Sequence, residues 1–529
     1  MMNLRLSSPA LLLGLLLLTT CTDDFEDINT NPSTYGAATF NPNYLLTTSQ
    51  LAYTGSADFA YDTWRANLIY SSTLTQGLST VISYWAGDKY LLNENYTAAY
   101  WGTNTAGAYA EQVKPVTELV ELTRGKAQYN NVHQMGRLMR VLSLQRLTDL
   151  YGDVPYFEAG QGFHRNVITP TYDKQEAIYA DLLKEAEEAT AALDPAADKP
   201  SGDVFYKGDV AKWQRLGNTV LLRLAMRLTK VDPDKAKAVV ARVQGKTLQS
   251  NADNAFVVHD VAGARVTQNR NSQVLLGDGG QENYYVKWSK TFIDYLRATN
   301  DPRLGRVAVT QLYPTATSKT PNSAFNTAAA AQKGMPNGKD LSGRPAFDIS
   351  GAPGYTSMPD YSSLHPGMTR RDGPTFVLTY AESELLLADA AQRWGVGGSA
   401  APHYNAGVTA AMTYLGQYDP SLAVPEAAAA AYLAAAPYRP ADGLEQINAQ
   451  YWVLTTTKLD FYESWANWRR TGLPRLTPVV YPNNATNGQI PRRFPYPTSE
   501  ITANPDNYRA ASAAVPGGDN LTGRVWWDK

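Results

Sequence analysis

The stretch Trp213-Gln-Arg-Leu-Gly-Asn-Thr-Val-Leu-Leu-Arg-Leu-Ala-Met-Arg-Leu228 carries a helical pattern over four turns. Side chains that recur three or four positions apart share one face of an α-helix. The apolar residues at that spacing are Trp213, Leu216, Val220, Leu221, Leu224 and Leu228. This pattern predicts a helix whose apolar face packs against a core.

Helical neighbours are expected around this helix and around a second stripe at Met135, Leu138, Met139 and Leu142. The expected pairs cover residues 106–150, 174–230 and 375–415, the last with helices at 375–394 and 403–415. A further long helix is expected from Leu444 to Trp468. Antiparallel pairs that stack side by side form tetratricopeptide-like scaffolds. The sequence therefore predicts a mainly α fold of helical hairpins with minor β structure.

Two long segments, 251–284 and 313–372, carry no helical period and are rich in Gly, Pro, Asn and Ser. Loops of this length are usually functional or disordered. We therefore expect long irregular loops between the helices.

The composition excludes some partners. With 47 Lys and Arg against 49 Asp and Glu, the chain has a formal net charge of −2 and no basic excess for a phosphate backbone. Nucleic acid is not an expected partner. The aromatic residues are 33 Tyr, 11 Trp and 13 Phe, so most rings carry a polar group suited to wet surfaces as well as to helix packing.

The N-terminus reads as a secretory signal over residues 1–20, because its apolar run from Ala10 to Leu18 is too short to span a bilayer. Leu18-Thr-Thr-Cys21 follows, and Cys21 is the single cysteine of the chain. This resembles a bacterial lipobox, whose cysteine is acylated and anchors the protein to a membrane. Residues 21–30 would then be a lipidated acidic tether; the alternative is an ordinary signal with an incidental cysteine.

Catalytic signatures are missing from the sequence. The five histidines are widely separated, and no phosphate loop, dinucleotide fingerprint or Gly-x-Ser-x-Gly elbow occurs. We expect no catalytic residues, cofactor or metal motif, although scattered Asp and Asn leave structural calcium open. A secreted glycosidase stays an alternative, because two carboxyl groups brought together by the fold need no sequence spacing.

Seven segments together resemble the SusD/RagB family of nutrient-binding outer-membrane lipoproteins, in particular its starch-binding-associated branch. Each segment alone is weak, but their joint order along the chain is specific. The segments are Cys21–Pro32, Asp149–Tyr156, Asn300–Leu304, Tyr380–Ala391, Trp465–Pro474, Pro491–Glu500 and Val525–Asp528.

The resemblance implies a SusD-like fold, here a single domain over residues 31–529, and a role without catalysis. It implies a lipid-anchored protein on the cell exterior that captures oligosaccharides for a SusC-like TonB-dependent transporter. The RagB branch handles peptides, so a peptide ligand is an alternative. A scaffold that only completes the transporter complex is another.

A sugar site needs flat aromatic faces together with Asn, Asp and Arg side chains that read hydroxyl groups. The first candidate is the stretch 84–101, where the alternative is a buried helix interface; the second is 281–288, and the third runs from Tyr355 to His365. The candidate residues are Trp85, Asp88, Tyr90, Asn93, Asn95, Tyr96, Tyr100, Trp101, Asn283, Tyr284, Tyr285 and Trp288.

Overall fold

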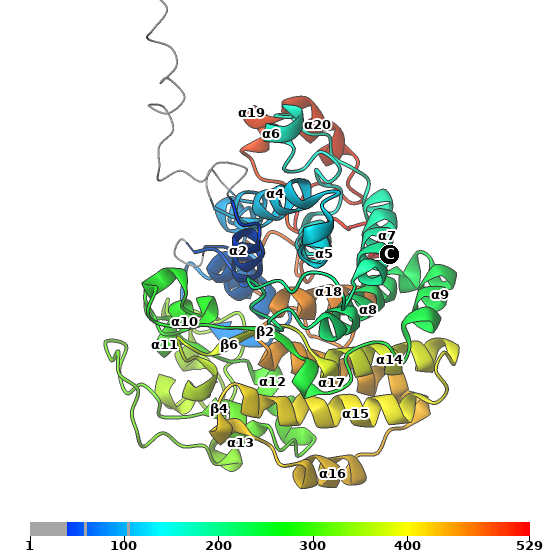
Figure 1. Ribbon diagram of the computed structural model, residues 1–529. Coiled ribbons are helices and arrows are strands. Elements are labelled where there is room, and N and C mark those ends of the chain that lie inside the picture. Colours follow the sequence, from blue (N-terminus) through cyan, green and yellow to red (C-terminus); the bar gives the residue numbers. More distant parts are fainter. Residues whose placement is uncertain (1–39, 58–60, 103–105) are drawn as a thin grey trace, which may run out of the picture. The chain divides into compact units, whose positions relative to one another are not determined.

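The computed structural model describes residues 40–57, 61–102 and 106–529 (Figure 1). The chain divides into two units, Met1–Pro42 and Asn43–Lys529, and every element named below belongs to the second. The expected signal segment 1–20, Cys21 and the tether 21–30 lie outside the described residues.

The fold is mainly helical, with 53% helix and 6% strand, as expected. The longer helices are α2 (Asn43–Tyr53), α4 (Lys114–Thr123), α5 (Asn130–Tyr151), α7 (Gln175–Ala192), α8 (Val210–Arg227), α9 (Pro233–Val243), α12 (Lys290–Ala298), α14 (Tyr380–Trp394), α15 (Ala400–Thr413), α16 (Glu426–Ala435), α17 (Gly443–Thr457), α18 (Phe461–Thr471) and α20 (Pro505–Ala513). The π-helical segments are η1 (Thr63–Ser72) and η3 (Ala108–Val113). The short α-helices are α3 (Glu94–Thr97), α6 (Gly162–Arg165), α10 (Arg270–Leu275), α11 (Glu282–Tyr285), α13 (Leu304–Val307) and α19 (Glu500–Ala503).

Helical hairpins form one side of this unit. Helix α4 packs on α5, α7 on α8, and α14 on α15, which places a contacting pair in each of the three expected ranges. Further contacts of α5 with α7 and of α8 with α14 join the pairs into one scaffold (Figure 1). Helix α8 begins where the side chain of Asp209 accepts a hydrogen bond from the backbone of Lys212, and its apolar face is buried as predicted.

The expected helix over 375–394 starts later than predicted. Residues Pro374–Leu378 form strand β6, which pairs antiparallel with β2 (Ala255–Val258). Pro374 cannot donate a helical hydrogen bond, and the three residues after it, Thr, Phe and Val, are β-branched or aromatic. The hydroxyl of Thr379 then caps α14 by accepting from the backbone of Glu382 at 3.3 Å.

The expected long helix from Leu444 to Trp468 is also wrong, because it is two helices, α17 and α18. The break falls at Leu459, whose φ of +58° is left-handed, a conformation that no helix interior accepts. Asp460 restarts the chain as the cap of α18. The apolar period continues across the break, so it concealed the turn.

The strands form three two-stranded antiparallel sheets in the described part of the chain. Besides β2–β6, strand β4 (Ala308–Val309) pairs with β5 (Ser363–Leu364), and β1 (Leu78–Thr80) pairs with β3 (Val286–Trp288). In β1–β3, Leu78 lies opposite Trp288 and Thr80 opposite Val286. This sheet joins the first and second candidate segments, because one follows β1 and the other overlaps β3.

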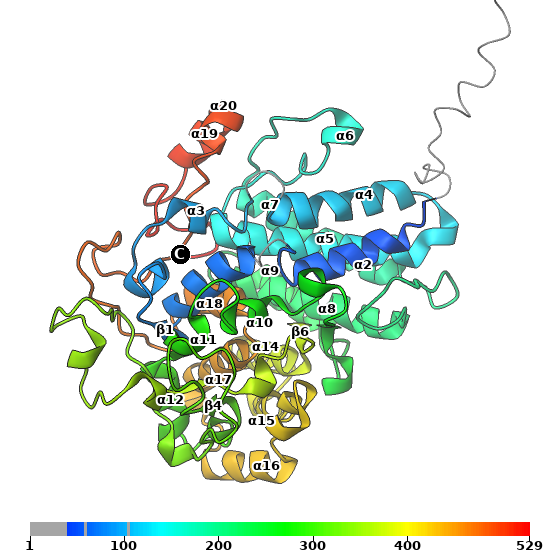
Figure 2. The same cartoon turned by 90° about the vertical axis from the view of Figure 1, so that its left-hand side faces the viewer.

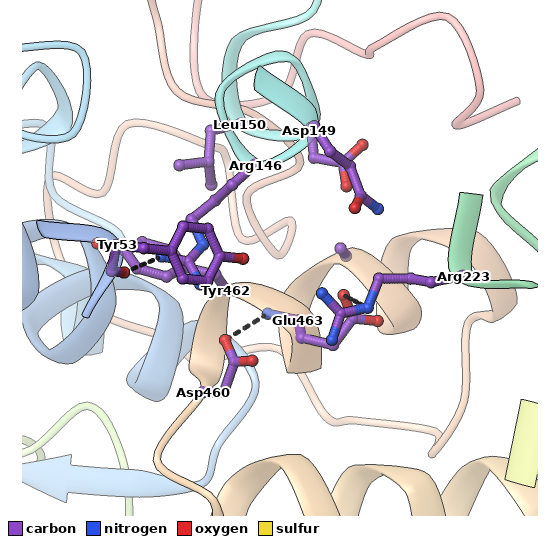
Figure 3. Close-up of a pocket in the computed structure, with 10 residues that line it drawn as sticks. Tyr53, Arg146, Asp149, Leu150, Arg223, Asp460, Tyr462 and Glu463 are labelled. Atoms are coloured by element: carbon purple, nitrogen blue, oxygen red, sulfur yellow. Dashed lines mark hydrogen bonds and ion pairs between the residues drawn. The ribbon is translucent and has the colours of Figure 1, made fainter. Parts of the chain in front are cut away.

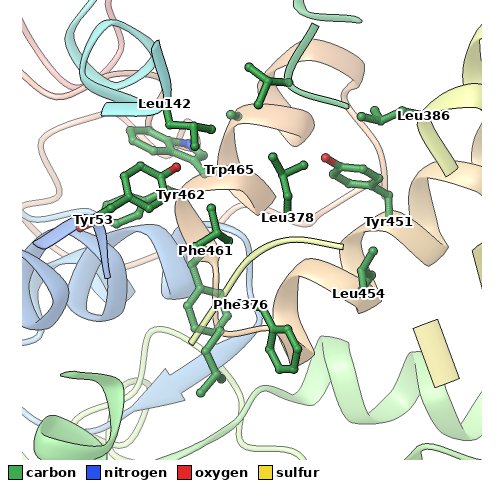
Figure 4. Packing of buried hydrophobic residues seen from close by; sticks show 14 of the residues in the cluster. Tyr53, Leu142, Phe376, Leu378, Leu386, Tyr451, Leu454, Phe461, Tyr462 and Trp465 are labelled. Carbon is green, nitrogen blue, oxygen red and sulfur yellow. The ribbon is translucent and has the colours of Figure 1, made fainter. Parts of the chain in front are cut away.

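The core is continuous across the scaffold, and large rings from distant segments meet in it (Figure 4). It also holds buried ion pairs. Arg227 lies 3.2 Å from Asp149 and 2.5 Å from Glu463. Glu382 lies 2.6 Å from Arg223 and 2.9 Å from Lys458. Their desolvated charges are compensated by each other, as buried charges require.

Candidate ligand-binding site

Most of the aromatic residues expected to meet a ligand belong to the core instead. Trp85, Tyr90, Tyr100 and Trp288 are 0% exposed and Trp101 is 5% exposed. Ring faces that are enclosed by protein cannot stack on a sugar, so the expectation for these five residues is corrected to a packing role. Their composition could not reveal this, because helix interfaces and sugar sites use the same residue types.

The contacts of these rings show what they do. Trp101 stacks on Tyr172 with ring centroids 5.6 Å apart, and the Tyr100 hydroxyl donates to Gln112 at 3.1 Å. The Trp288 indole donates to the carbonyl of Val307 at 2.9 Å. These contacts tie the 84–101 segment and strand β3 to the rest of the fold.

Two polar candidates are buried as well. Asp88 accepts from the backbone of Gly338 at 3.0 Å and from the side chain of Asn337, and burial raises the pKa of Asp88 to about 7. Asn283 is 3% exposed and donates to the carbonyl of Ser318 at 2.8 Å. Both therefore hold loops in place, and the Asp88 contacts anchor the loop that leads to residues 339–344.

The remaining candidates reach the surface. Asn95 is exposed and Tyr96 is half-buried, while Asn93 caps α3 by accepting from the backbone of Tyr96 at 3.2 Å. Tyr284 and Tyr285 are half-buried, and their rings meet edge to face at 4.8 Å.

The second and third candidate segments converge in one place. Tyr284, Tyr285 and Tyr355 all pack, half-buried, against the same small cluster that contains Val81 and Tyr361. Because Val81 directly follows β1, this cluster also adjoins the beginning of the first candidate segment. The β1–β3 pairing and helix α11, which contacts β3, hold this group together (Figure 2).

A cavity of about 560 Å³ opens beside this group. Its walls come from four distant parts of the chain: residues 81–91, residues 279–285, residues 340–344 and Tyr481. Sites for small molecules are commonly concave spaces of this size with a few directed polar groups among apolar ones. Its lining residues are Val81, Ile82, Ser83, Tyr84, Lys89, Leu91, Gly279, Gly280, Gln281, Tyr285, Asp340, Leu341, Ser342, Arg344 and Tyr481.

One wall of the cavity is organised around Tyr84. Its hydroxyl donates to Oε1 of Glu282 at 2.5 Å, and the same oxygen accepts from the indole of Trp64 at 3.1 Å. The rings of Trp64 and Tyr84 meet edge to face at 6.1 Å. Burial and the bond to Glu282 raise the pKa of Tyr84, so its phenol stays protonated and remains a donor.

Another part of the lining is organised around Tyr481. Its hydroxyl donates to Asp340 at 2.8 Å, and Arg344 lies 2.6 Å from the same carboxylate. Partial burial works to raise the pKa of Asp340, but hydrogen bonds from Ser342, Arg344 and Tyr481 hold it well below its usual range. Asp340 is therefore ionised at neutral pH and fixes both partners.

Lys89 also lines the cavity. Its Nζ donates to the carbonyl of Ile82 at 3.3 Å and lies 5.9 Å from the centroid of the Tyr481 ring. Burial lowers the pKa of Lys89, and the acidic groups of Asp88 and Asp340 partly offset this. The cavity thus combines tyrosine rings with ammonium, guanidinium, carboxylate and hydroxyl groups.

Other cavities suit a ligand less well. A space of about 760 Å³ beside α4, α5 and α7 is lined by ion pairs such as Arg137–Glu185, with the half-exposed Phe157 as its single aromatic besides two histidines. The cavity drawn in Figure 3 lies among Arg146, Arg223 and Glu463 and has about 20 Å³, room for about one water molecule. It belongs to the interior ion-pair network.

Sequence reasoning missed several lining residues. Asp340 and Arg344 lie in a long loop without a helical period, and Tyr481 lies in the irregular stretch between α18 and α19. No spacing connects them to Tyr84, and only the fold brings them to one cavity. Tyr84 itself stands at the start of the first candidate stretch but was not among the candidate residues.

Among residues 40–57, 61–102 and 106–529, no three His, Cys, Asp or Glu side chains come together as a set that could hold a metal ion. In those ranges, no helix has both the length and the apolar character needed to cross a bilayer.

Comparison with known proteins identifies the family. Residues 40–497 match the SusD-like family model described as starch-binding associating with outer membrane. A solved chitin-binding protein is 32% identical, with a TM-score of 0.79 over 92% of this chain and 100% of its own. A SusD-like protein of Bacteroidetes AC2a is 26% identical, with a TM-score of 0.78 over 93% of this chain and 100% of its own.

More distant structures share the fold. A SusD homolog from Bacteroides uniformis is 22% identical, with a TM-score of 0.73 over 93% of this chain and 100% of its own. Among curated proteins, none matches the chain. With the family model covering most of the sequence, the chain belongs to the SusD-like family and is a non-catalytic, nutrient-binding protein associated with the outer membrane.

Proposed function

We propose that this protein captures an oligosaccharide in the cavity between Tyr84 and Tyr481 and delivers it to a TonB-dependent transporter. The observation that carries the proposal is the cavity itself. Half-buried tyrosine rings stand on its walls, and carboxyl groups hold the hydroxyls of Tyr84 and Tyr481, which fixes these two rings for contact with the C–H faces of a sugar. Lys89, Arg344, Gln281 and Ser83 supply groups for sugar hydroxyls.

Chitin and starch fragments are the first ligands to test. The family model is described as starch-binding, and the 32% identical structure is named a chitin-binding protein. The proposal extends this ligand class to the present cavity. A peptide is the second candidate, because charged side chains line part of the cavity, but the tyrosine faces favour a glycan.

Calorimetric titration with chitohexaose and with maltohexaose tests the proposal. Saturable binding of at least one hexasaccharide is expected, weakened at least tenfold by the double substitution Tyr84→Ala and Tyr481→Ala. The matched control removes an exposed tyrosine, Tyr44→Ala, and should bind like the wild type. Absence of binding by the wild type to any glycan of a broad panel would contradict the proposal.

The delivery role extends the proposal to the membrane. Acylation of Cys21 would hold the protein at the outer membrane, facing the cell exterior, where it meets a SusC-like partner. Affinity capture of the full-length protein through a tag at Lys529 should recover a large TonB-dependent β-barrel from detergent-solubilised outer membranes. The Cys21→Ala variant should be lost from the membrane fraction, and recovery of wild-type protein alone would contradict the role.

A further inference from the structure

Glu282 is placed unusually for a residue that serves only folding. Its side chain is 1% exposed, yet both partners of its Oε1 are neutral donors, the Trp64 indole and the Tyr84 hydroxyl. Its Oε2 has no hydrogen-bond partner within the described part of the chain. A buried carboxyl group without a cation and with an unpaired oxygen costs folding free energy. Stability alone therefore does not explain this residue.

The position of Glu282 links two walls of the cavity. Glu282 is the first residue of α11, while Tyr84 belongs to the segment after β1 and lies 198 residues earlier. Tyr84 lines the cavity, whereas Glu282 and Trp64 lie behind it. The Glu282 side chain therefore does not touch a ligand in this cavity, but it contacts a ring that does.

Gly279 and Gly280, which precede Glu282, let the backbone approach Trp64 and Tyr84 closely. A Cβ on Gly280 would lie 2.7 Å from the Tyr84 hydroxyl and 2.8 Å from Oε2 of Glu282. A Cβ on Gly279 would lie 3.1 Å from the Trp64 ring. The backbone of this loop thus rests directly against both rings, and a side chain there would displace them. The hydroxyl end of Tyr84 is therefore held between the Glu282 carboxyl group and the backbone of Gly280, and its ring meets the Trp64 indole edge to face.

We infer that Glu282 is the positioning residue of the site: it fixes the ring plane of Tyr84 and so determines how tightly the cavity holds a sugar. This inference rests on the proposed function. A ring that is already oriented loses less conformational freedom when a ligand binds. The entropy cost of binding is therefore smaller and the affinity is higher. Glutamine keeps an oxygen where Oε1 lies, and it replaces the unpartnered oxygen with an amide group.

The test measures affinity for chitohexaose, or for maltohexaose if only that sugar binds, with the full-length protein in detergent micelles. Glu282→Leu should weaken binding about tenfold, because Tyr84 loses its acceptor. Glu282→Gln should stay within about threefold of the wild type. Glu445→Leu, which changes a half-exposed glutamate of α17, is the matched control and should leave affinity unchanged.

A double-variant cycle separates positioning from general packing. In a Tyr84→Ala background, Glu282→Leu should cause no further loss, because the ring that it orients is gone. If the two losses add, or if Glu282→Leu binds within twofold of the wild type, the inference is wrong although the proposed function stands. If the wild type binds no glycan, the proposed function fails first.

Tyr84→Phe provides a second test in case the Glu282→Leu protein does not fold. It keeps the ring and removes the hydroxyl that Glu282 accepts, so binding should weaken several-fold while thermal unfolding stays cooperative. Gly280→Ala should act in the same direction by displacing the hydroxyl. Wild-type affinity in Tyr84→Phe would overturn the inference.

Discussion

The hydroxyl of Tyr481 donates a hydrogen bond of 2.8 Å to Oδ2 of Asp340, a residue 141 positions earlier in the chain. Arg344 binds both: its Nη2 lies 2.6 Å from Asp340 and donates to the Tyr481 hydroxyl at 2.8 Å. The three side chains, all of which line the cavity, form a closed set of hydrogen bonds. An aromatic ring held in this way presents a fixed face.

Asp340→Asn tests the role of this set of hydrogen bonds. Asparagine weakens the bond to Arg344 and frees Tyr481, so hexasaccharide affinity should fall several-fold. The free energy of unfolding should change by less than about 1 kcal/mol, because the Arg344 side chain is half-exposed. Calorimetric titration and chemical denaturation measure the two effects. The control is Asp442→Asn, which changes an exposed ion pair with Arg439 and should alter neither affinity nor stability. Wild-type affinity in Asp340→Asn would show that these hydrogen bonds do not support binding.

Substitution of Tyr481 separates its ring from its hydroxyl. Tyr481→Phe keeps the ring but loses the hydrogen bond that fixes it, so affinity should fall several-fold, whereas Tyr481→Ala also removes the stacking face and should lose about tenfold or more. Competition titration with a fluorescent hexasaccharide gives both values. Equal losses in the two variants would mean that the hydroxyl, and not the ring face, contacts the sugar.

Trp101 should behave as a core residue. Trp101→Ala removes a ring packed against Tyr109, Tyr151, Tyr172 and Tyr496, and should lower the free energy of unfolding by about 3–5 kcal/mol. The folded fraction should bind sugar with wild-type affinity. Denaturant-induced unfolding measures the loss of stability. Hexasaccharide titration at denaturant concentrations below the unfolding transition measures the affinity of the folded protein. A stable variant with lost affinity would return Trp101 to the binding site.

The buried pair of Arg470 and Asp389 makes a prediction about stability. Their closest atoms lie 2.9 Å apart, and both side chains are buried. Arg470→Met leaves Asp389 with Arg393 as its remaining cation and should lower the free energy of unfolding by about 3 kcal/mol. The double variant with Asp389→Leu should regain most of this, because both buried charges are then gone and the remaining Arg393 side chain is partly exposed to water. No recovery would show that Arg470 stabilises mainly through its other contacts.

Asp389 also predicts an acid sensitivity. Burial works to raise its pKa, but Arg470 and Arg393 lower it to about 2, below its ordinary value near 4. A carboxyl group with a depressed pKa stabilises the fold above its unfolded pKa, and this stability is lost as pH falls. Asp389 should contribute about 2 kcal/mol that disappears between about pH 4 and pH 2. Between about pH 4 and pH 2, the free energy of unfolding should fall less steeply in Asp389→Asn than in the wild type. The same pH dependence in both proteins would contradict this role of Asp389.

The helical scaffold was predictable because the buried face of a helix carries apolar residues that recur every three or four positions in the sequence. The stripe from Trp213 to Leu228 became α8, with its apolar face buried. The same periodicity failed where a local signal interrupted it, at Leu459 and at Pro374. Those interruptions depend on one or two residues and do not change the apolar pattern around them.

The proposed binding site was predictable only in part. Tyr284 and Tyr285 were candidates because they stand in an aromatic loop; both are half-buried, and Tyr285 lines the cavity. Trp85 and Trp101 were assigned to a ligand because composition does not distinguish a buried ring from an exposed one. Tyr481 and Asp340 were missed, since their proximity exists only in the folded chain.

The most direct test of the account is calorimetric titration of the full-length protein with chitohexaose and maltohexaose, run beside the Tyr84→Ala, Tyr481→Ala double variant. We expect saturable binding of one hexasaccharide per wild-type chain and at least a tenfold loss of affinity in the variant, with thermal unfolding still cooperative. Equal affinity in the two proteins would contradict the placement of the ligand in this cavity.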